Sequence, residues 1–216
     1  MNEKQIRDFL RNLENTDRYR ELLKIKEWSM LHWEVLAIME YFSQRTTGPI
    51  VELGPYLGAG TTVLAAAARE QILPIITVEM GGAHDHPTLP SNDILFDLKA
   101  NLKRHGVQDR VIVVEGVSRD PVIVARIGDL LDGRQIGLLV MDTDGMVEED
   151  LRNFGQFCSP DCLLVIDDYF STGAPEKATL IKPVIDALRN QGKLIEYGVY
   201  GWGTWIGQIS GNEQTF

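Results

Sequence analysis

The stretch Pro49-Ile50-Val51-Glu52-Leu53-Gly54-Pro55-Tyr56-Leu57-Gly58-Ala59-Gly60-Thr61-Thr62 decides the fold of this chain. Its short apolar run predicts a buried parallel strand that ends at an acid and a glycine. Two further glycines and the alanine-rich segment Val63–Arg69 predict a tight turn that leads into a helix. Glycines suit such a turn because a Cβ would collide wherever the backbone approaches a ligand closely. The stretch therefore predicts a cofactor loop, against the alternative of an ordinary strand–helix turn.

Length and composition limit the classes of protein to consider. The 216 residues suit one catalytic domain with a small appendage, and a net charge of −10 leaves no basic surface for a nucleic acid. No apolar run approaches the roughly 20 residues of a membrane span, and the polar start shows no signal peptide. The two cysteines, Cys158 and Cys162, form no disulfide framework and no CxxC pair. We therefore expect a cytoplasmic protein that has neither nucleic acid nor membrane as a partner.

Hydrophobic periodicity predicts that helices and strands alternate along the chain. Two amphipathic helices are expected first, over residues 1–15 and over Tyr19–Phe42. Strands are then expected at 50–53, 74–79, 111–115, 136–141 and 163–166, with helices at 63–69, 93–105, 120–131, 147–158 and 178–191, and a closing hairpin of 193–200 and 204–209.

This order predicts a doubly wound α/β fold: a mostly parallel, seven-stranded, Rossmann-like sheet with a C-terminal antiparallel hairpin. Residues 1–44 are expected to form a helical lid or an oligomer contact, and residues 45–216 the catalytic domain. The sequence leaves open whether the N-terminal helix packs on its own domain or on a twofold partner in a homodimer.

Every predicted parallel strand ends in an acid. Because ligands of such sheets bind outside the carboxyl ends of the strands, these acids are expected to gather at one edge. They are Glu52, Glu79, Glu115, Asp142 and the pair Asp167-Asp168.

The spacing of the glycines narrows the choice of nucleotide. The dinucleotide fingerprint, begun at Gly54, would need glycine where Tyr56 and Ala59 stand, and a phosphate-binding P-loop would need a lysine after Gly60. The acid Glu52 would repel a pyrophosphate but suits a cationic or amine-bearing ligand. Glu79, about 19 residues past Gly60, is placed to accept hydrogen bonds from a ribose diol.

The segment Glu52–Gly60, together with Glu79, the turn Glu115–Ser118 and the terminal hairpin, resembles the class I S-adenosylmethionine-dependent methyltransferases. The resemblance covers roughly residues 45–210 and implies an enzyme of the EC 2.1.1 type. It implies that S-adenosylmethionine is bound by Glu52, Gly54, Tyr56, Gly58, Gly60, Thr61, Glu79, Met80, Gly116, Val117, Ser118 and Asp142.

Asp142, Asp167 and Asp168 suggest a subgroup. Two strand ends bring three hard oxygen ligands to one point, which suits Mg²⁺, with Ca²⁺ or Mn²⁺ as alternatives. This arrangement resembles the metal-dependent catechol-type O-methyltransferases and their sugar-modifying relatives in antibiotic biosynthesis. The alternatives are that Asp167 and Asp168 form a turn or a helix cap, and that Asp142 contacts the substrate.

The chain departs from that resemblance at Gly145, where metal-dependent relatives commonly carry a lysine or histidine as general base. Candidates for a base elsewhere are His84 and His86, because an unperturbed histidine titrates near neutral pH. Asp144 is a third candidate, and His32 is a fourth if the N-terminal helices cover the site.

The expected activity is methyl transfer from S-adenosylmethionine to a hydroxyl of a small molecule of natural-product, phenolic or sugar type, assisted by a divalent metal. One alternative is a metal-independent methyltransferase acting on nitrogen or carbon of a small molecule. Another is a catalytically silent protein that binds S-adenosylmethionine.

Overall fold

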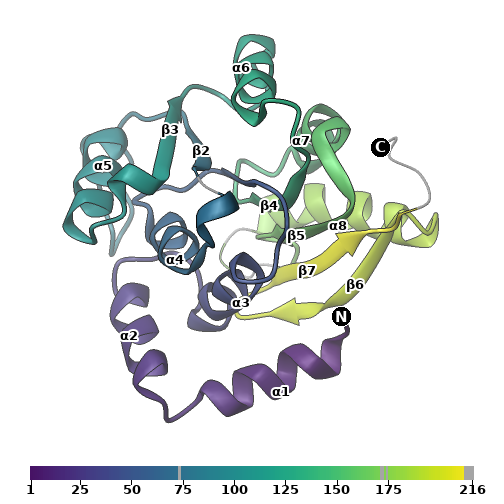
Figure 1. The fold of residues 1–216 in the computed structure, drawn as a ribbon, viewed down its shortest axis with the longest axis horizontal. Coiled ribbons are helices and arrows are strands. Elements are labelled where there is room, and N and C mark those ends of the chain that lie inside the picture. The colour runs from purple at the N-terminus through teal and green to yellow at the C-terminus, as the bar shows by residue number, and fades with distance from the viewer. Residues whose placement is uncertain (73, 171–172, 174, 212–216) are drawn as a thin grey trace.

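A seven-stranded sheet forms the centre of the molecule (Figure 1). The structure is a computed structural model, and it describes residues 1–72, 74–170, 173 and 175–211. The strand order is β3-β2-β1-β4-β5-β7-β6, and only β7 runs against its neighbours β5 and β6. The strands are β1 (Ile50–Leu53), β2 (Ile75–Glu79), β3 (Val111–Glu115), β4 (Ile136–Met141), β5 (Cys158–Ile166), β6 (Leu194–Tyr200) and β7 (Thr204–Ile209). The predicted mostly parallel sheet and its terminal antiparallel hairpin are confirmed.

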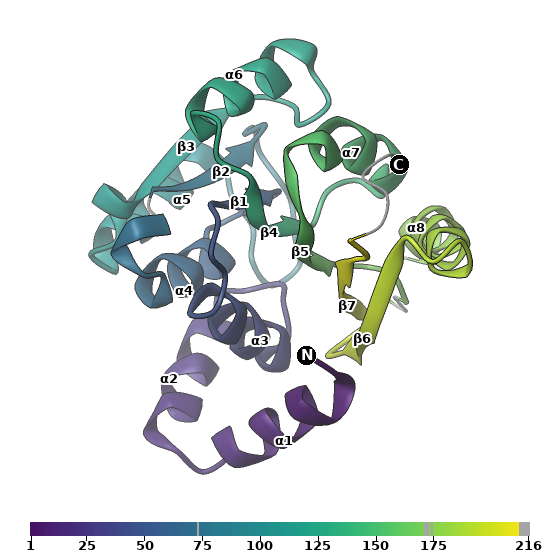
Figure 2. The ribbon, with the colours of Figure 1, turned by 45° about the vertical axis from the view of Figure 1, so that its right-hand side comes forward.

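Helices cover both faces of the sheet (Figure 2). The α-helices are α1 (Glu3–Leu13), α2 (Asp17–Lys26), α3 (Trp33–Ser43), α4 (Ala59–Ala67), α5 (Ile94–Arg104), α6 (Pro121–Leu131), α7 (Val147–Phe154) and α8 (Pro175–Asn190). Short 3-10 helices are η1 (Glu70–Ile72), η2 (Gln108–Arg110) and η3 (Gly155–Phe157). One core joins the sheet to α1 through α5, and a second joins its opposite face to α6, α7 and α8.

The central strand β4 shows how one strand supplies both cores. Leu138 and Val140 belong to the first core, while Leu139 and Met141 belong to the second. Successive side chains of a strand point to opposite faces, so a strand covered on both sides is apolar at every position.

The predicted single helix over Tyr19–Phe42 is wrong, because the chain forms two helices there. α2 ends at Lys26, and α3 begins after His32, whose Nδ1 accepts a hydrogen bond from the Glu34 amide at 3.4 Å. Between them the Ser29 hydroxyl accepts a bond from the Leu31 amide at 3.0 Å. These side chains satisfy amides that a continuous helix would have bonded, so the break needs no glycine or proline.

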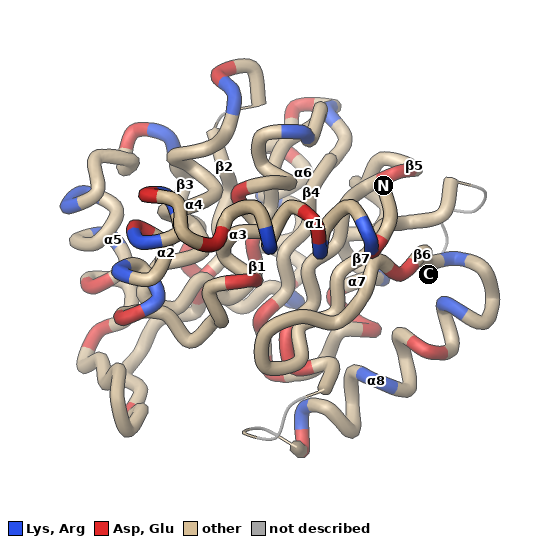
Figure 3. The backbone as a smooth tube through the Cα atoms, turned by 90° about the horizontal axis from the view of Figure 1, so that it is seen from below, with Lys and Arg blue, Asp and Glu red and all other residues tan. Residues whose placement is uncertain are grey.

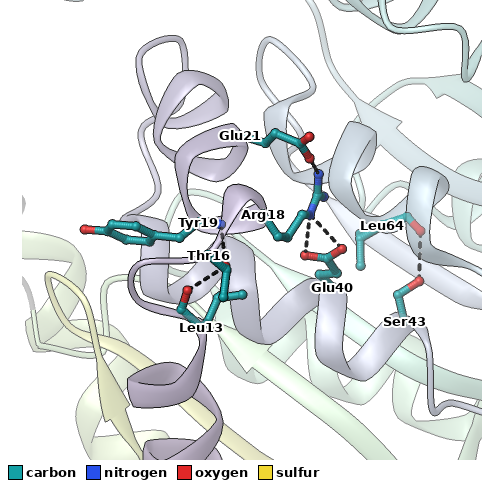
Figure 4. Close-up of polar contacts among 8 residues, drawn as sticks. All are labelled: Leu13, Thr16, Arg18, Tyr19, Glu21, Glu40, Ser43 and Leu64. Carbon is teal, nitrogen blue, oxygen red and sulfur yellow. Dashed lines mark hydrogen bonds and ion pairs between the residues drawn. The ribbon is translucent and has the colours of Figure 1, made fainter.

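Polar contacts attach the N-terminal helices to the domain (Figure 4). Arg18 of α2 donates to Glu40 of α3 at 2.9 Å, and Ser43 of α3 donates to the Leu64 carbonyl of α4 at 2.8 Å. In α1, Ile6 and Leu10 are buried in the first core, and the helix lies against α3 and β6 (Figure 1). Within this single chain, α1 therefore packs on its own domain.

Strand β5 begins five positions earlier than the predicted residues 163–166. The predicted helix 147–158 is correspondingly shorter, since α7 ends at Phe154 and η3 follows. Pro160 and Asp161 interrupt the apolar pattern, so the sequence did not indicate that the strand begins before them. In the structure Cys158 already pairs with Ile136 of β4. A proline is tolerated where a strand has an irregular register, and the pairing of β4 with β5 shifts between Ile136 and Leu138.

Charged residues of both signs are interspersed along α1, α2 and α8 (Figure 3). Within the described ranges, no helix combines the length and the apolar character that crossing a membrane requires.

Gly54 lies where the ends of β1 and β4 come together. Its φ is +81°, and a Cβ placed on it would lie 1.9 Å from the carbonyl oxygen of Asp142. The Asp142 amide donates to the Leu53 carbonyl at 2.9 Å, which holds the two strand ends together. Glycine is therefore required here both by the left-handed backbone and by the neighbouring strand.

We expect Gly54→Ala to lower the free energy of unfolding by about 3 kcal/mol or more, because it adds a backbone clash to left-handed strain. Urea unfolding followed by circular dichroism measures this loss. Gly82→Ala is the matched control, since Gly82 also has a positive φ, +90°, but open space around it. The control is expected to lose only about 1 kcal/mol, and equal losses would contradict the role assigned to the Gly54–Asp142 contact.

Candidate active site

The glycine loop after β1 is shaped by contacts within the protein itself. Gly58 has a φ of +86° and forms the N-cap of α4, where a Cβ would lie 2.5 Å from Leu98 Cδ1. A Cβ on Gly60 would lie 2.6 Å from Glu52 Oε1. The glycines thus bring α4 close to β1 and α5, and the loop's position beside the strand ends follows from that close packing.

Glu52 lies buried beneath this loop. Its carboxylate accepts a hydrogen bond from the Thr77 hydroxyl at 3.2 Å and a second from the Thr61 hydroxyl. Burial raises the pKa of Glu52 to about 7, since the two hydroxyls offset only part of the cost of removing the charge from water. Near neutral pH the group is therefore poised between its charged and neutral forms.

Glu79 closes β2 on the other side of the loop and is only 6% exposed. One carboxylate oxygen accepts from the Tyr56 amide at 3.1 Å and the other from the Gly81 amide at 3.0 Å. Burial raises the pKa of Glu79, and the backbone amides of Gly81, Tyr56 and Met80 work against that rise. A carboxylate has about four acceptor sites, so it can still accept from a ligand diol.

Two apolar side chains project at the ends of β2 and β3. Met80 is 70% exposed and Val117 is 45% exposed, and the Gly116 amide donates to the Glu79 carbonyl at 2.9 Å. The hydroxyl of Ser118 donates to Asp150 at 2.8 Å. Exposed apolar groups on neighbouring strand ends form a surface that suits a flat ring.

Asp150 is a buried residue that the sequence analysis missed. It also accepts from the Thr143 hydroxyl at 2.9 Å, so it joins the turn after β3 to the turn after β4. Its position near the start of α7 places a negative charge at the positive end of a helix.

A cavity of about 800 Å³ opens at the carboxyl edge of the sheet. Asp142, Asp167 and Asp168 line it together with Lys177, His84 and His86, and His32 and Trp202 also contribute. The structure thus brings the three predicted metal ligands and three of the four predicted bases to one cavity.

The three aspartates form one cluster, in which one carboxylate oxygen from each lies within 4.8 Å of the others. Thr204 donates to Asp167, and Lys177 Nζ lies 3.0 Å from Asp168 Oδ2. Burial, and next the charge of Asp167, raises the pKa of Asp142 well above its usual value. A set of three carboxylate oxygens fits a hard divalent cation such as Mg²⁺ or Ca²⁺.

The four predicted bases differ in what their atoms already bind. His86 Nδ1 accepts from the amides of Thr88 and Leu89, at 3.2 and 3.1 Å, so the neutral ring carries its proton on Nε2. His86 therefore presents a donor to the cavity. His84 packs its ring edge-on against Tyr56, with centroids 5.6 Å apart.

His32 and Asp144 are also engaged. His32 Nδ1 serves as the cap of α3, and burial lowers the pKa of its ring. Asp144 accepts two bonds from Arg119, at 2.8 and 2.7 Å. Burial acts to raise the pKa of Asp144, but the guanidinium of Arg119 outweighs it and lowers that pKa. A carboxylate held this way is a weak proton acceptor.

Lys177 is the residue of the site that the sequence analysis missed most completely. The predicted helix 178–191 began one residue after it, whereas α8 begins at Pro175. The sequence offered no signal for it, because the predicted boundary left Lys177 outside the helix and its partner is chosen by proximity in space.

The glycine loop, Glu79 and the acid cluster all lie in one segment, residues 51–169, that a known protein family shares. The family model described as "Methyltransferase domain" matches residues 51–169, more than half of the chain, and the chain belongs to this family. The predicted class I methyltransferase is thereby confirmed. No curated protein sequence matches the chain closely enough to count as a relative.

Solved structures of methyltransferases share the fold. A protein described as a caffeoyl-CoA O-methyltransferase from Staphylococcus aureus is 14% identical, with a TM-score of 0.66 over 96% of this chain and 99% of that one. The methyltransferase PaMTH1 of Podospora anserina, solved with S-adenosylhomocysteine, is 16% identical (TM-score 0.63, 96% and 95% covered). The O-methyltransferase TomG of Streptomyces achromogenes is 13% identical, with a TM-score of 0.62 over 92% of each chain. TomG is involved in tomaymycin synthesis and was solved with S-adenosylmethionine.

The raised pKa of Glu52 predicts a pH effect on stability. Folded Glu52 holds its proton up to about pH 7, while an exposed glutamate loses it near 4.5, so ionisation of Glu52 lowers stability progressively between these values. Glu52→Gln keeps the acceptor for Thr61 and Thr77 but cannot ionise. Its free energy of unfolding, relative to wild type, should rise by about 2 kcal/mol between pH 5 and pH 8. If urea unfolding showed that the free energies of unfolding of Glu52→Gln and wild type change in parallel with pH, the raised pKa of Glu52 would be refuted.

Proposed function

We propose that the protein transfers the methyl group of S-adenosylmethionine to a hydroxyl of a small molecule, with a divalent cation held at the acid cluster. The observation that supports this most is the position of Asp142. It lines the cavity together with Asp167 and Asp168, and its backbone contacts Gly54 of the glycine loop. A methyl donor on the loop and an acceptor at the cluster would therefore meet at one residue.

The residues around the loop would position the donor. Glu79 would accept from the ribose hydroxyls, and Met80 and Val117 would flank the adenine, with Gly116 and Ser118 between them. Glu52, Thr61 and the backbone of Tyr56 to Gly60 would surround the methionine end, where an acid suits an amine.

Residues 28–31 lie over that methionine end. Trp28, Ser29, Met30 and Leu31 line, with Gly54 and Gly60, a space of only about 20 Å³, which is room for about one water molecule. We infer that this segment between α2 and α3 moves aside when the donor enters. It is the part of residues 1–44 that would act as a lid.

The acceptor would occupy the 800 Å³ cavity. A divalent cation there would bind two vicinal acceptor oxygens and lower the pKa of one hydroxyl. The ring of Trp202 on the rim, 57% exposed, suits a flat or sugar-like face, and His86 would donate from Nε2. His84 is the base candidate whose ring nitrogens have no hydrogen-bond partner among the described residues.

One observation favours the metal-independent alternative, in which nitrogen or carbon is methylated. Lys177 supplies a cation to the cluster without any metal. We also propose that the protein is cytoplasmic and forms a homodimer.

Binding of S-adenosylhomocysteine, measured by isothermal titration calorimetry, tests the donor site. We expect Glu79→Gln to weaken binding about 10- to 100-fold, because both oxygens of Glu79 accept backbone amides and an added NH₂ would oppose one of them. Glu70→Gln is the matched control, since Glu70 lies in η1 before the opposite end of β2 and its side chain is 83% exposed. Absence of binding to the wild type would end the methyltransferase proposal.

Removal of metal tests the acid cluster. With a panel of catechols, other phenols and sugars as acceptors, we expect methylation to stop in EDTA and to return with Mg²⁺. Asp167→Ala should reduce the restored rate about 100-fold or more, since it removes a charged ligand. Asp161→Ala, at the exposed opposite end of β5, should match the wild type. Methylation that survives both EDTA and Asp167→Ala would exclude a metal role.

A further inference from the structure

We propose that Lys177 is a resident cation of the acid cluster, and that a divalent metal binds there only by displacing its ammonium from Asp168. The inference rests on the metal site of the proposed function and adds a competitor that belongs to the protein itself. It makes Lys177 a positioning residue that decides how tightly the cluster holds a metal.

The first support is the contact itself. Lys177 Nζ lies 3.0 Å from Asp168 Oδ2, and the lysine lines the same cavity as Asp142 and Asp167. Its side chain is 31% exposed and that of Asp168 is 16% exposed, so the pair is partly shielded from water. An ion pair in such a place is stronger than one on the surface.

The second support is the packing at Gly145. A Cβ on Gly145 would lie 3.4 Å from Lys177 Cα and 3.5 Å from Lys177 Cβ. These are ordinary van der Waals distances, so the first turn of α8 packs directly beside position 145, three residues after Asp142. This packing places Lys177 next to the end of β4, and its cationic side chain reaches the cluster from α8.

The third support is the position of Lys177 in its helix. It stands in the first turn of α8, where the helix dipole disfavours a cation. By contrast, Lys182 of the same helix pairs with Asp186 one turn later, at 2.6 Å. Lys177 instead pairs outside α8, with the cluster, and that pairing compensates for its unfavourable place.

The charges explain why the two cations would compete. Three carboxylates and one ammonium leave the cluster with two uncompensated negative charges if all groups are ionised. A divalent ion that contacted Asp168 with the ammonium still in place would lie within about 4 Å of a like charge, which is strongly unfavourable at the effective dielectric of a protein. The ammonium has to move toward the open cavity when a metal binds.

Binding of Mn²⁺ alone, followed by electron paramagnetic resonance of the full chain, tests the competition without any acceptor. We expect Lys177→Met and Lys177→Gln to bind Mn²⁺ at least about tenfold more tightly than the wild type, because the competing charge is gone. Lys177→Arg keeps the charge and should resemble the wild type, as should the matched control Lys182→Met. Thermal melting of each variant verifies that it is folded, and one folded neutral variant, Lys177→Met or Lys177→Gln, is sufficient for the comparison with Lys177→Arg.

Equal or weaker Mn²⁺ binding by folded Lys177→Met and Lys177→Gln would overturn the proposal, as would Lys177→Arg binding as tightly as they do. Binding of S-adenosylhomocysteine is measured on the same samples. If S-adenosylhomocysteine binding is intact while substitution of Lys177 leaves the Mn²⁺ affinity unchanged, the competition proposal fails and the methyltransferase proposal stands. If Mn²⁺ binds to no variant, the metal and the competition fail together, whereas loss of S-adenosylhomocysteine binding by the wild type defeats the methyltransferase proposal itself.

Discussion

The close approach of Gly54 to the Asp142 carbonyl holds the ends of β1 and β4 together, and the rest of the site depends on it. A Cβ would not fit in that gap, so the loop leaves β1 beside the end of β4 and turns directly into α4. β1 lies between β2 and β4 in the sheet. One backbone contact therefore sets the distance between the loop that would hold a methyl donor and the acids that would hold an acceptor.

Burial of acids at this edge is the second constraint. Glu52 has a pKa near 7, and burial raises the pKa values of Asp142 and Asp167 as well. So many buried carboxylates at one edge of the sheet destabilise the fold unless cations or hydrogen-bond donors face them. Thr61 and Thr77 donate hydrogen bonds to Glu52, and Thr204 donates one to Asp167. Lys177 forms an ion pair with Asp168. The buried carboxylates of the site therefore repel one another, and a bound cation would reduce that repulsion.

Patterns that repeat along the chain predicted the fold well. Strands buried on both faces are continuous apolar runs, and an acid follows the carboxyl end of each run. The parallel sheet could therefore be predicted from segments such as Ile136–Met141. Prediction failed where side chains replace the backbone partners of a helix, as at Ser29 and His32, or where Pro160 and Asp161 lie within a strand. At Ser29 and His32 the contacts that end the helix are hydrogen bonds between residues two positions apart, whereas at the start of β5 the pairing of Cys158 with the distant Ile136 outweighs the local pattern.

By itself the sequence determined the class of fold, the glycine loop and the acids at the strand ends, because these follow from spacing within one segment and from the rule that parallel strands end at one edge. Only the tertiary structure decided what neutralises those acids. Lys177 lies 35 residues after Asp142 in the chain, and it reaches the cluster because α8 packs its first turn against Gly145. The partner of a buried charge is chosen by proximity in space, which spacing along the chain does not encode.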